Sequence, residues 1–123
     1  MTIEQAINQA DETCQNVYTK QEKIRWLSRL DAMIKAEIID THEDAAQVSF
    51  AGYHANTEPD TVLLVPAPWD EIYIRYLEMQ IAYANGEQGR YNNATDLYNT
   101  LFSDYRNAYN RKHMPLTTKV RYF

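Results

Sequence analysis

The chain contains few residues that interrupt helices and few that carry chemistry. Of its 123 residues, three are glycine and four are proline, which favours long helices over a many-turned β fold. The single cysteine, Cys14, excludes a disulfide within the chain, and we expect it to be a small buried hydrophobe on the first helix. No apolar run approaches the ~20 residues of a membrane span. The first residues also lack the basic and apolar regions of a signal peptide, so we expect a soluble intracellular protein with no membrane partner.

Residue combinations typical of catalytic and metal sites are also missing. The three histidines, His42, His54 and His113, lie in separate segments, whereas a zinc site needs three or four converging ligands. Acidic clusters near residue 43 and at residues 70–71 are explained by a solvated loop and a helix start. There is no glycine-rich phosphate loop and no nucleophile motif. We therefore expect no catalytic residue, no cofactor and no metal, and hence no enzyme.

Charge is distributed unevenly along the chain. The formal net charge is −5, which argues against a protein that grips nucleic acid through its phosphates. Residues 1–110 carry 8 basic and 17 acidic side chains, whereas residues 111–123 carry four basic side chains and no acidic one. A basic tail on an acidic body suits docking onto an acidic surface such as a neighbouring copy. Arg111, Lys112 and His113 would also complement a helix C-terminus, but that interpretation leaves Lys119 and Arg121 unexplained.

Apolar residues recur at helical spacing in four segments. The first runs from about residue 2 to residue 17 and begins with a capping box, Thr2 and Gln5. The second follows Thr19, and the third runs from about residue 66 to the Asn85-Gly86 stop. The fourth spans about residues 87–110, with tyrosines every seven residues, an arrangement typical of helices that bury a seam against other helices. The aromatic members of these last two seams are Trp69, Tyr76, Tyr83, Tyr91, Tyr98 and Tyr105.

These patterns predict an all-α, four-helix bundle-like domain over residues 1–115 and an extended tail over residues 116–123. We expect the first two helices to form an antiparallel hairpin. Asp31 and Lys35 should form an i, i+4 pair on the solvent side of the second helix.

Residues 40–66 break the helical period and form an insertion between the second and third helices. Two β-prone runs, residues 48–53 and 61–65, flank a turn-rich stretch, so we expect a short β-hairpin or an extended loop. Connections of this length without a function are uncommon, which makes the insertion a candidate contact arm.

The third helix is apolar on almost every side, more than one partner helix can cover. We therefore expect some of it to lie at a subunit boundary or under the insertion. The tail alternates in the manner of a strand and is free to pair elsewhere. The ten tyrosines also suggest an alternative function, in which they would stack on the bases of single-stranded nucleic acid. The basic residues that such binding surfaces place between their aromatic residues are missing here. The expected oligomer or partner interface comprises Trp69, Tyr73, Ile74, Leu77, Lys119, Val120, Arg121, Tyr122 and Phe123.

Several runs resemble small proteins encoded in prophage head modules of Gram-positive bacteria. These runs are WLSRLD at residues 26–31, IIDTH at 38–42, LLVPAPWDE at 63–71, YANGE at 83–87 and YNN at 91–93. The layout of four helices, inserted loop and trailing tail is similar to the head–tail adaptor, or head-completion, proteins of tailed bacteriophages. The resemblance covers nearly the whole chain and carries no catalytic signature.

The resemblance implies a structural role in the virion. Such adaptors assemble as a ring, typically of twelve copies, below the portal protein and extend the DNA channel toward a stopper or tail-completion protein. DNA would then be only passing cargo, and an acidic wall suits a conduit that repels phosphates. The protein would be made in the bacterial cytoplasm and end in the neck of the virion. Two alternatives stay open: another virion or assembly accessory protein, and a helical prophage regulatory protein that binds a host partner.

Overall fold

The computed structural model describes residues 1–113, and this part of the chain is mostly helical, with long non-helical stretches only at residues 14–19 and 48–68. Its α-helices are α1 (Ile3–Thr13), α2 (Lys20–Glu37), α3 (Ile72–Asn85) and α4 (Gln88–Lys112). Three short 3-10 turns accompany them: η1 (Ile39–Thr41), η2 (Ala45–Gln47) and η3 (Trp69–Glu71). The all-α prediction is therefore confirmed. The predicted tail, residues 116–123, lies outside the described residues.

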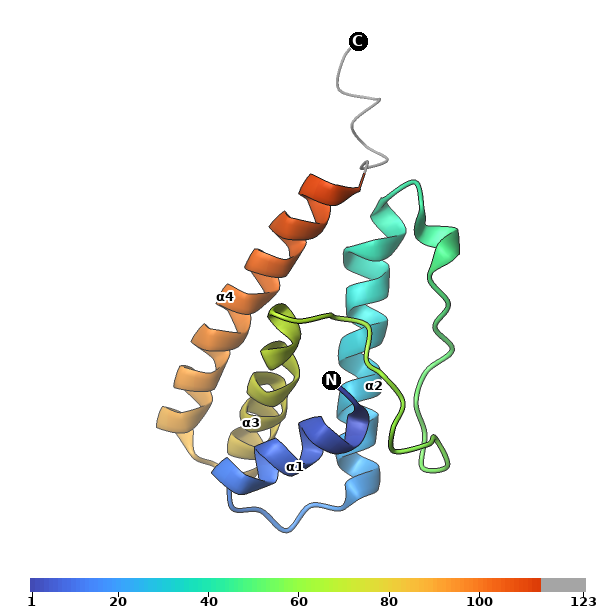
Figure 1. Cartoon of the computed structure of the whole chain (residues 1–123). Helices are drawn as coiled ribbons and strands as arrows, with labels where there is room; N and C mark the ends of the chain where they lie inside the picture. The colour runs from blue at the N-terminus through green and yellow to red at the C-terminus, as the bar shows by residue number, and fades with distance from the viewer. Residues whose placement is uncertain (114–123) are drawn as a thin grey trace.

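Figure 1 shows α2, α3 and α4 running side by side, with α1 lying across the lower end of α2 and α3. The short helix α1 therefore does not form the expected antiparallel hairpin with α2. It begins at the predicted capping box, in which the Gln5 amide donates to Thr2 Oγ1 and the Thr2 amide to Gln5 Oε1.

The end of α1 was predicted four residues too late. It ends at Thr13 because the Asn16 side chain donates to the Cys14 carbonyl and accepts from the Tyr18 amide. Such local side-chain bonds offer the backbone an alternative to the helix. Val17, expected on the apolar stripe, is 94% exposed. Cys14 is buried as expected, but it caps α1 and is not part of the helix.

Helix α2 starts where the sequence predicts, since Thr19 Oγ1 accepts a hydrogen bond from the Glu22 amide. Its predicted apolar stripe is buried throughout, comprising Ile24, Leu27, Leu30, Ile34 and, at the helix end, Ile38. The expected Asp31–Lys35 surface pair is wrong. Asp31 is completely buried, and Lys35 instead forms an ion pair with Asp40 at 2.5 Å.

Helix α3 is the central element, which explains its apolar surface. It packs against α1, α2 and α4, so that the helices of its own chain cover most of its faces. It ends at Gly86, whose φ of 75° is left-handed and favours glycine. Helix α4 lies along α3 and buries Ala94, Tyr105 and Ala108, whereas Tyr91 and Tyr98 remain half-exposed.

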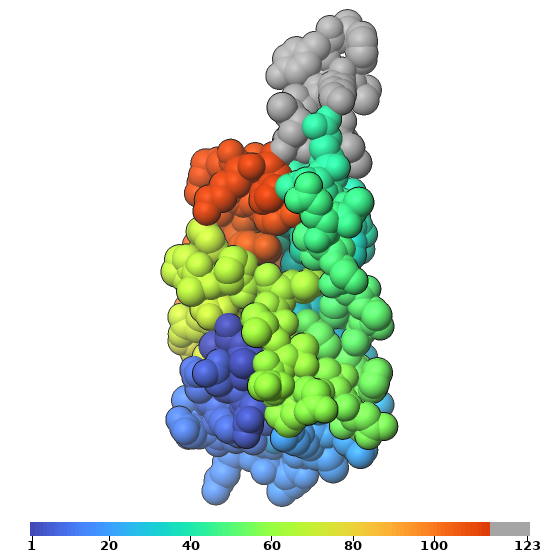
Figure 2. Space-filling model, turned by 45° about the vertical axis from the view of Figure 1, so that its right-hand side comes forward, coloured from blue at the N-terminus to red at the C-terminus, as the bar shows by residue number. Residues whose placement is uncertain are grey.

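The insertion contains no hairpin of its own. Residues 61–63 pair instead with the N-terminal residues: the Ile3 amide donates to the Thr61 carbonyl and the Leu63 amide to the Met1 carbonyl, both at 3.0 Å. The segment thus descends along α2, turns, and passes the N-terminus before entering α3 (Figure 1). Figure 2 shows the start of the insertion beside the end of α4, with the segment leading into α3 below them.

Candidate docking site

An open groove lies between the insertion and the last turns of α4. Its volume is about 320 Å³. One wall comes from the insertion and the segment before α3, and the other comes from α4. The lining residues are Ile39, Val48, Leu64, Pro66, Trp69, Tyr105, Ala108, Tyr109, Lys112 and His113. The lining is predominantly apolar, which is typical of a surface that binds an apolar or aromatic side chain.

A chain of aromatic contacts forms the floor of this Trp69 groove. The ring of Trp69 lies 5.9 Å from that of Tyr105, and Tyr105 lies 5.8 Å from Tyr109. Tyr109 stacks on His113 with ring centroids 3.9 Å apart, and Lys112 Nζ lies 5.7 Å from the Trp69 ring. Burial raises the pKa of Tyr105 to about 12, so its hydroxyl stays neutral at physiological pH. Rigid aromatic surface with a polar rim is characteristic of protein-binding hot spots.

Hydrogen bonds hold the upper end of the groove in shape. The buried His42 donates from Nδ1 to the Ile38 carbonyl at 2.5 Å, and its Nε2 lies 2.7 Å from Asn110 Oδ1. His113 Nδ1 contacts an oxygen of Asp44. These contacts join the last turns of α4 to the start of the insertion. The two histidines that the sequence places far apart therefore act in one cluster, as positioning groups.

Next to the groove, the insertion continues from Val48 into a stretch of backbone without hydrogen bonds to the described residues. Val48 is extended, with φ −106° and ψ 119°, and its amide bonds to the Ala45 carbonyl. The amides and carbonyls of residues 49–51 make no hydrogen bond to any described residue. Ser49 and Ala51 are exposed. Extended backbone with free donors and acceptors is a template for an added strand.

Behind the groove, Asp31 fastens the insertion to α2. Its carboxylate accepts hydrogen bonds from the hydroxyls of Tyr53 at 2.5 Å and Tyr73 at 2.6 Å, and from the Leu64 amide at 3.1 Å. The Tyr73 hydroxyl in turn accepts from the Val65 amide at 2.7 Å. Burial raises the pKa of Asp31 above its usual value of 3.8, although all three hydrogen bonds oppose the shift.

The tyrosines of this Asp31 cluster are held in the neutral form. Burial and the adjacent Asp31 raise the pKa values of both Tyr53 and Tyr73. Asp31 and Tyr73 are fully buried, so no substrate reaches the carboxylate or that phenol. The cluster therefore positions the insertion and offers no accessible acid or base.

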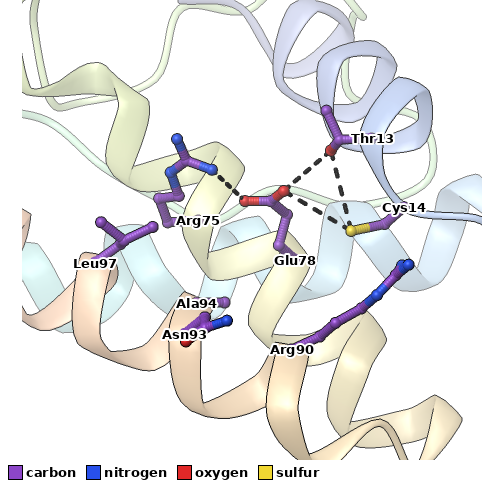
Figure 3. A pocket seen from close by; sticks show the side chains of 8 residues that line it. All are labelled: Thr13, Cys14, Arg75, Glu78, Arg90, Asn93, Ala94 and Leu97. Atoms are coloured by element: carbon purple, nitrogen blue, oxygen red, sulfur yellow. Dashed lines mark hydrogen bonds and ion pairs between the residues drawn. The ribbon is translucent and has the colours of Figure 1, made fainter.

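A second, polar pocket of about 230 Å³ lies between the end of α1 and the facing turns of α3 and α4. In Figure 3, Glu78 points toward Thr13 and Cys14 on one side and toward Arg75 on the other. Its carboxylate accepts from Thr13 Oγ1 at 3.0 Å and from Arg75 at 2.8 Å. Burial and Glu78 raise the pKa of the Cys14 thiol, whereas a nucleophilic cysteine requires a lowered one. This pocket is a satisfied polar contact between helices.

The structure distributes the expected interface residues over different environments. Trp69 lines the groove and is partly exposed, and Ile74 is half-buried on α3. Tyr73 and Leu77 are completely buried, so they offer no surface to another subunit. Tyr73 does lie under the insertion, which was the other expectation for this helix. The five tail residues of the predicted interface lie outside the described residues.

Sequence reasoning missed Asp31, although a signal was present. Asp31 follows Leu27 by four residues and precedes Ile34 by three, which places its side chain on the buried face of α2. A carboxylate at such a position requires polar partners from elsewhere in the chain. Two tyrosines 22 and 42 residues away provide them.

Among residues 1–113 no group of three or more histidine, cysteine, aspartate or glutamate side chains is placed to hold a metal ion. None of the helices in this part of the chain is long and apolar enough to cross a membrane. No family model, no curated protein and no solved structure matches the chain.

Proposed function

We propose that this protein works by docking rather than by catalysis, as a head–tail adaptor subunit of a tailed bacteriophage. In this proposal it assembles as a ring below the portal protein, extends the DNA channel, and receives the stopper or tail-completion protein. The observation that carries the proposal is the Trp69 groove. It is an open apolar groove with a partly exposed Trp69, and it lies beside backbone without hydrogen bonds, at the end of the domain where the basic C-terminal segment begins.

The polar side chains support docking because the groups suited to chemistry are already occupied or inaccessible. Asp31 is enclosed by three donors, and Glu78 is bonded to Thr13 and Arg75. In contrast, the Trp69 groove has a largely apolar lining. Interface cores have this composition, in which aromatic residues are enriched and charges are depleted.

The charge distribution supports a place beside passing DNA. Residues 36–74 contain eight aspartate and glutamate residues and no lysine or arginine. An acidic stretch of this kind disfavours binding to phosphates. The same stretch favours basic segments of protein partners, including the segment after residue 110 of this chain. In this proposal the protein is made in the bacterial cytoplasm and resides in the neck of the virion.

Deleting the gene from the phage separates this role from the other phage roles. We expect heads that are filled with DNA but not joined to tails. Empty or misshapen heads would instead indicate a capsid accessory protein, and normal particles with altered expression would indicate a regulatory protein. Either result would contradict the adaptor role.

A matched pair of variants tests whether the groove carries the docking. The variant Trp69→Ala should restore few joined particles when supplied to the deletion phage. Tyr83→Ala removes an aromatic side chain from α3 that is 73% exposed and lies outside the groove, and it should restore them fully. Circular dichroism of both variants checks that the helices remain formed.

A further inference from the structure

We propose that the Trp69 groove receives residues 116–123 of a second copy of this chain, which add as a strand along residues 48–51. This inference rests on the proposed self-assembly and names the contact that produces it. It makes the insertion of one copy the receptor and the C-terminal segment of the next copy the ligand. Copies joined in this head-to-tail manner form a ring when the rotation between them closes.

The backbone of the receptor wall is suited to strand addition. Residues 49–51 are free of hydrogen bonds to the described residues, and Val48 has strand dihedral angles. An incoming strand would satisfy these donors and acceptors. In this mode of recognition main-chain hydrogen bonds provide affinity, and alternate side chains provide specificity by entering pockets.

The sequence of the segment matches the two faces of such a strand. Residues 118, 120 and 122 are Thr, Val and Tyr, and residues 117, 119 and 121 are Thr, Lys and Arg. Successive side chains of a strand point to opposite faces. Val120 and Tyr122 would therefore enter the apolar groove together, while Lys119 and Arg121 would face away from it.

The surroundings of the groove complement those two positive charges. Asp40 and Asp44 lie in the turns that precede Val48, within the stretch of the chain that has no lysine or arginine. Asp44 gives one carboxylate oxygen to His113, and its other oxygen, Oδ1, is buried without a hydrogen-bond partner among the described residues.

The position of the segment in its own chain favours a second copy over the same copy. His113 itself lines the groove, and only Met114 and Pro115 separate it from residue 116. A residue that precedes proline favours extended backbone. To lie along residues 48–51, the segment of the same copy would have to reverse its direction within these two residues. The segment of a neighbouring copy has no such constraint.

Disulfide trapping between differently tagged copies tests the proposal directly. Ser49→Cys in one full-length copy is mixed with another copy in which one cysteine is introduced at residue 117, 119 or 121, and the native Cys14 is buried in both copies. We expect a crosslinked heterodimer for at least one of these three, because Ser49 is exposed beside Val48, which lines the groove. Cysteines at residues 118, 120 and 122 should crosslink poorly, since their side chains face the groove. A disulfide requires Cβ atoms about 4 Å apart, so the alternation reports strand geometry.

The control replaces the receptor position only. Asn99→Cys is exposed on α4 and lies outside the Trp69 groove, and it should not crosslink to any segment position. Lys119→Glu combined with Arg121→Glu should lower the crosslinking yield of the productive pair several-fold. An unchanged yield would remove the electrostatic part of the proposal.

The remaining outcomes distinguish failure of this contact from failure of the proposed adaptor role. A crosslink that forms within one copy carrying both cysteines, but never between copies, would show own-chain docking and overturn the proposal. Self-association in sedimentation without any crosslink would overturn this contact and leave the adaptor role standing. Absence of both self-association and portal binding would remove the adaptor role, and this inference with it.

Discussion

The Asp31 cluster and the Trp69 groove share the short segment that leads into α3. The cluster is buried and polar, whereas the groove is open and mostly apolar. On one side of this segment the Leu64 amide donates to the buried Asp31, while on the other side Leu64 lines the open Trp69 groove. In the Asp31 cluster every donor around the carboxylate has a partner within the chain. In the groove the aromatic side chains contact one another, and Tyr105 and Tyr109 are buried, whereas Trp69 remains partly exposed at an open apolar surface. The Asp31 cluster determines where the insertion lies, and the Trp69 groove provides a surface to which another molecule could bind.

The difference between the two regions follows from the free energy that a buried polar group costs when it has no hydrogen-bond partner. A buried donor without an acceptor costs about 1–3 kcal/mol, so a cluster of polar groups persists inside a domain only if it is complete. Exposed aromatic surface costs less and can be covered later by a partner. The contacts of Asp31 therefore fix the position of the insertion within the single chain, whereas the groove stays open to a partner.

Of the changes that test this comparison, removal of the Asp31 carboxylate should have the largest effect on stability. Asp31→Ala leaves the Tyr73 hydroxyl and the Leu64 amide without their acceptor and creates a small cavity, so we expect the free energy of unfolding to fall by about 3 kcal/mol. Glu37→Ala on the exposed surface of the same helix is the control and should change it by less than about 0.5 kcal/mol. Chemical denaturation measures both. Equal stabilities for the two variants would show that the cluster does not hold the insertion.

The hydroxyls of Tyr73 and Tyr53 should contribute different amounts to the free energy of unfolding. Tyr73→Phe removes a donor to Asp31 and the acceptor of the Val65 amide, whereas Tyr53→Phe removes a donor from a half-buried ring. We expect losses of about 2 kcal/mol for Tyr73→Phe and about 1 kcal/mol for Tyr53→Phe. Hydrogen exchange should localise the second loss to the insertion. The reverse order of the two losses would mean that the Val65 bond contributes nothing.

Trp69→Ala tests the role of the groove, because its main effect should be on association and not on stability. Truncating a central aromatic residue of an interface commonly weakens binding by more than about 1 kcal/mol. We therefore expect self-association to weaken roughly tenfold, which corresponds to about 1.4 kcal/mol. Sedimentation measures the association, with Tyr83→Ala as the aromatic control that should associate normally. A Trp69→Ala variant that unfolds while its remaining folded fraction still associates would place Trp69 in the core.

The features that sequence could predict are the local ones. The caps at Thr2 and Thr19, the buried stripe of α2 and the stop at Gly86 depend on residues within one turn, and all of them were predicted correctly. The end of α1 was missed because the Asn16 side chain competes with the helix. The candidate site was predicted only at Trp69. Its shape depends on pairings such as Asp31 with Tyr73, which lie 42 residues apart, and periodicity carries no information about such pairings.

The surplus apolar surface of the third helix shows the same limit. Tyr73 and Leu77 were interpreted as interface residues because one partner helix could not cover α3. In the structure α1, α2 and α4 all pack against α3, so the domain itself uses most of that surface. Counting apolar residues indicated how much surface must be covered, but it could not indicate whether the cover comes from the same chain.

The smallest expected effect is the response of the Asp31 cluster to pH. Burial raises the pKa of Asp31 in the folded chain above its usual 3.8, so between these two pKa values the folded state binds more protons than the unfolded state. The contribution of Asp31 to stability is therefore greatest at low pH and falls as pH rises through the folded pKa. The variant Asp31→Asn lacks this group, and the other carboxylates cancel in the comparison of the two proteins. We expect wild type to gain stability relative to Asp31→Asn as pH is lowered from 7 toward 4, as measured by denaturation at each pH. A relative loss over the same range would mean that the hydrogen bonds from Tyr53, Tyr73 and Leu64 outweigh burial and hold the folded pKa below its usual value.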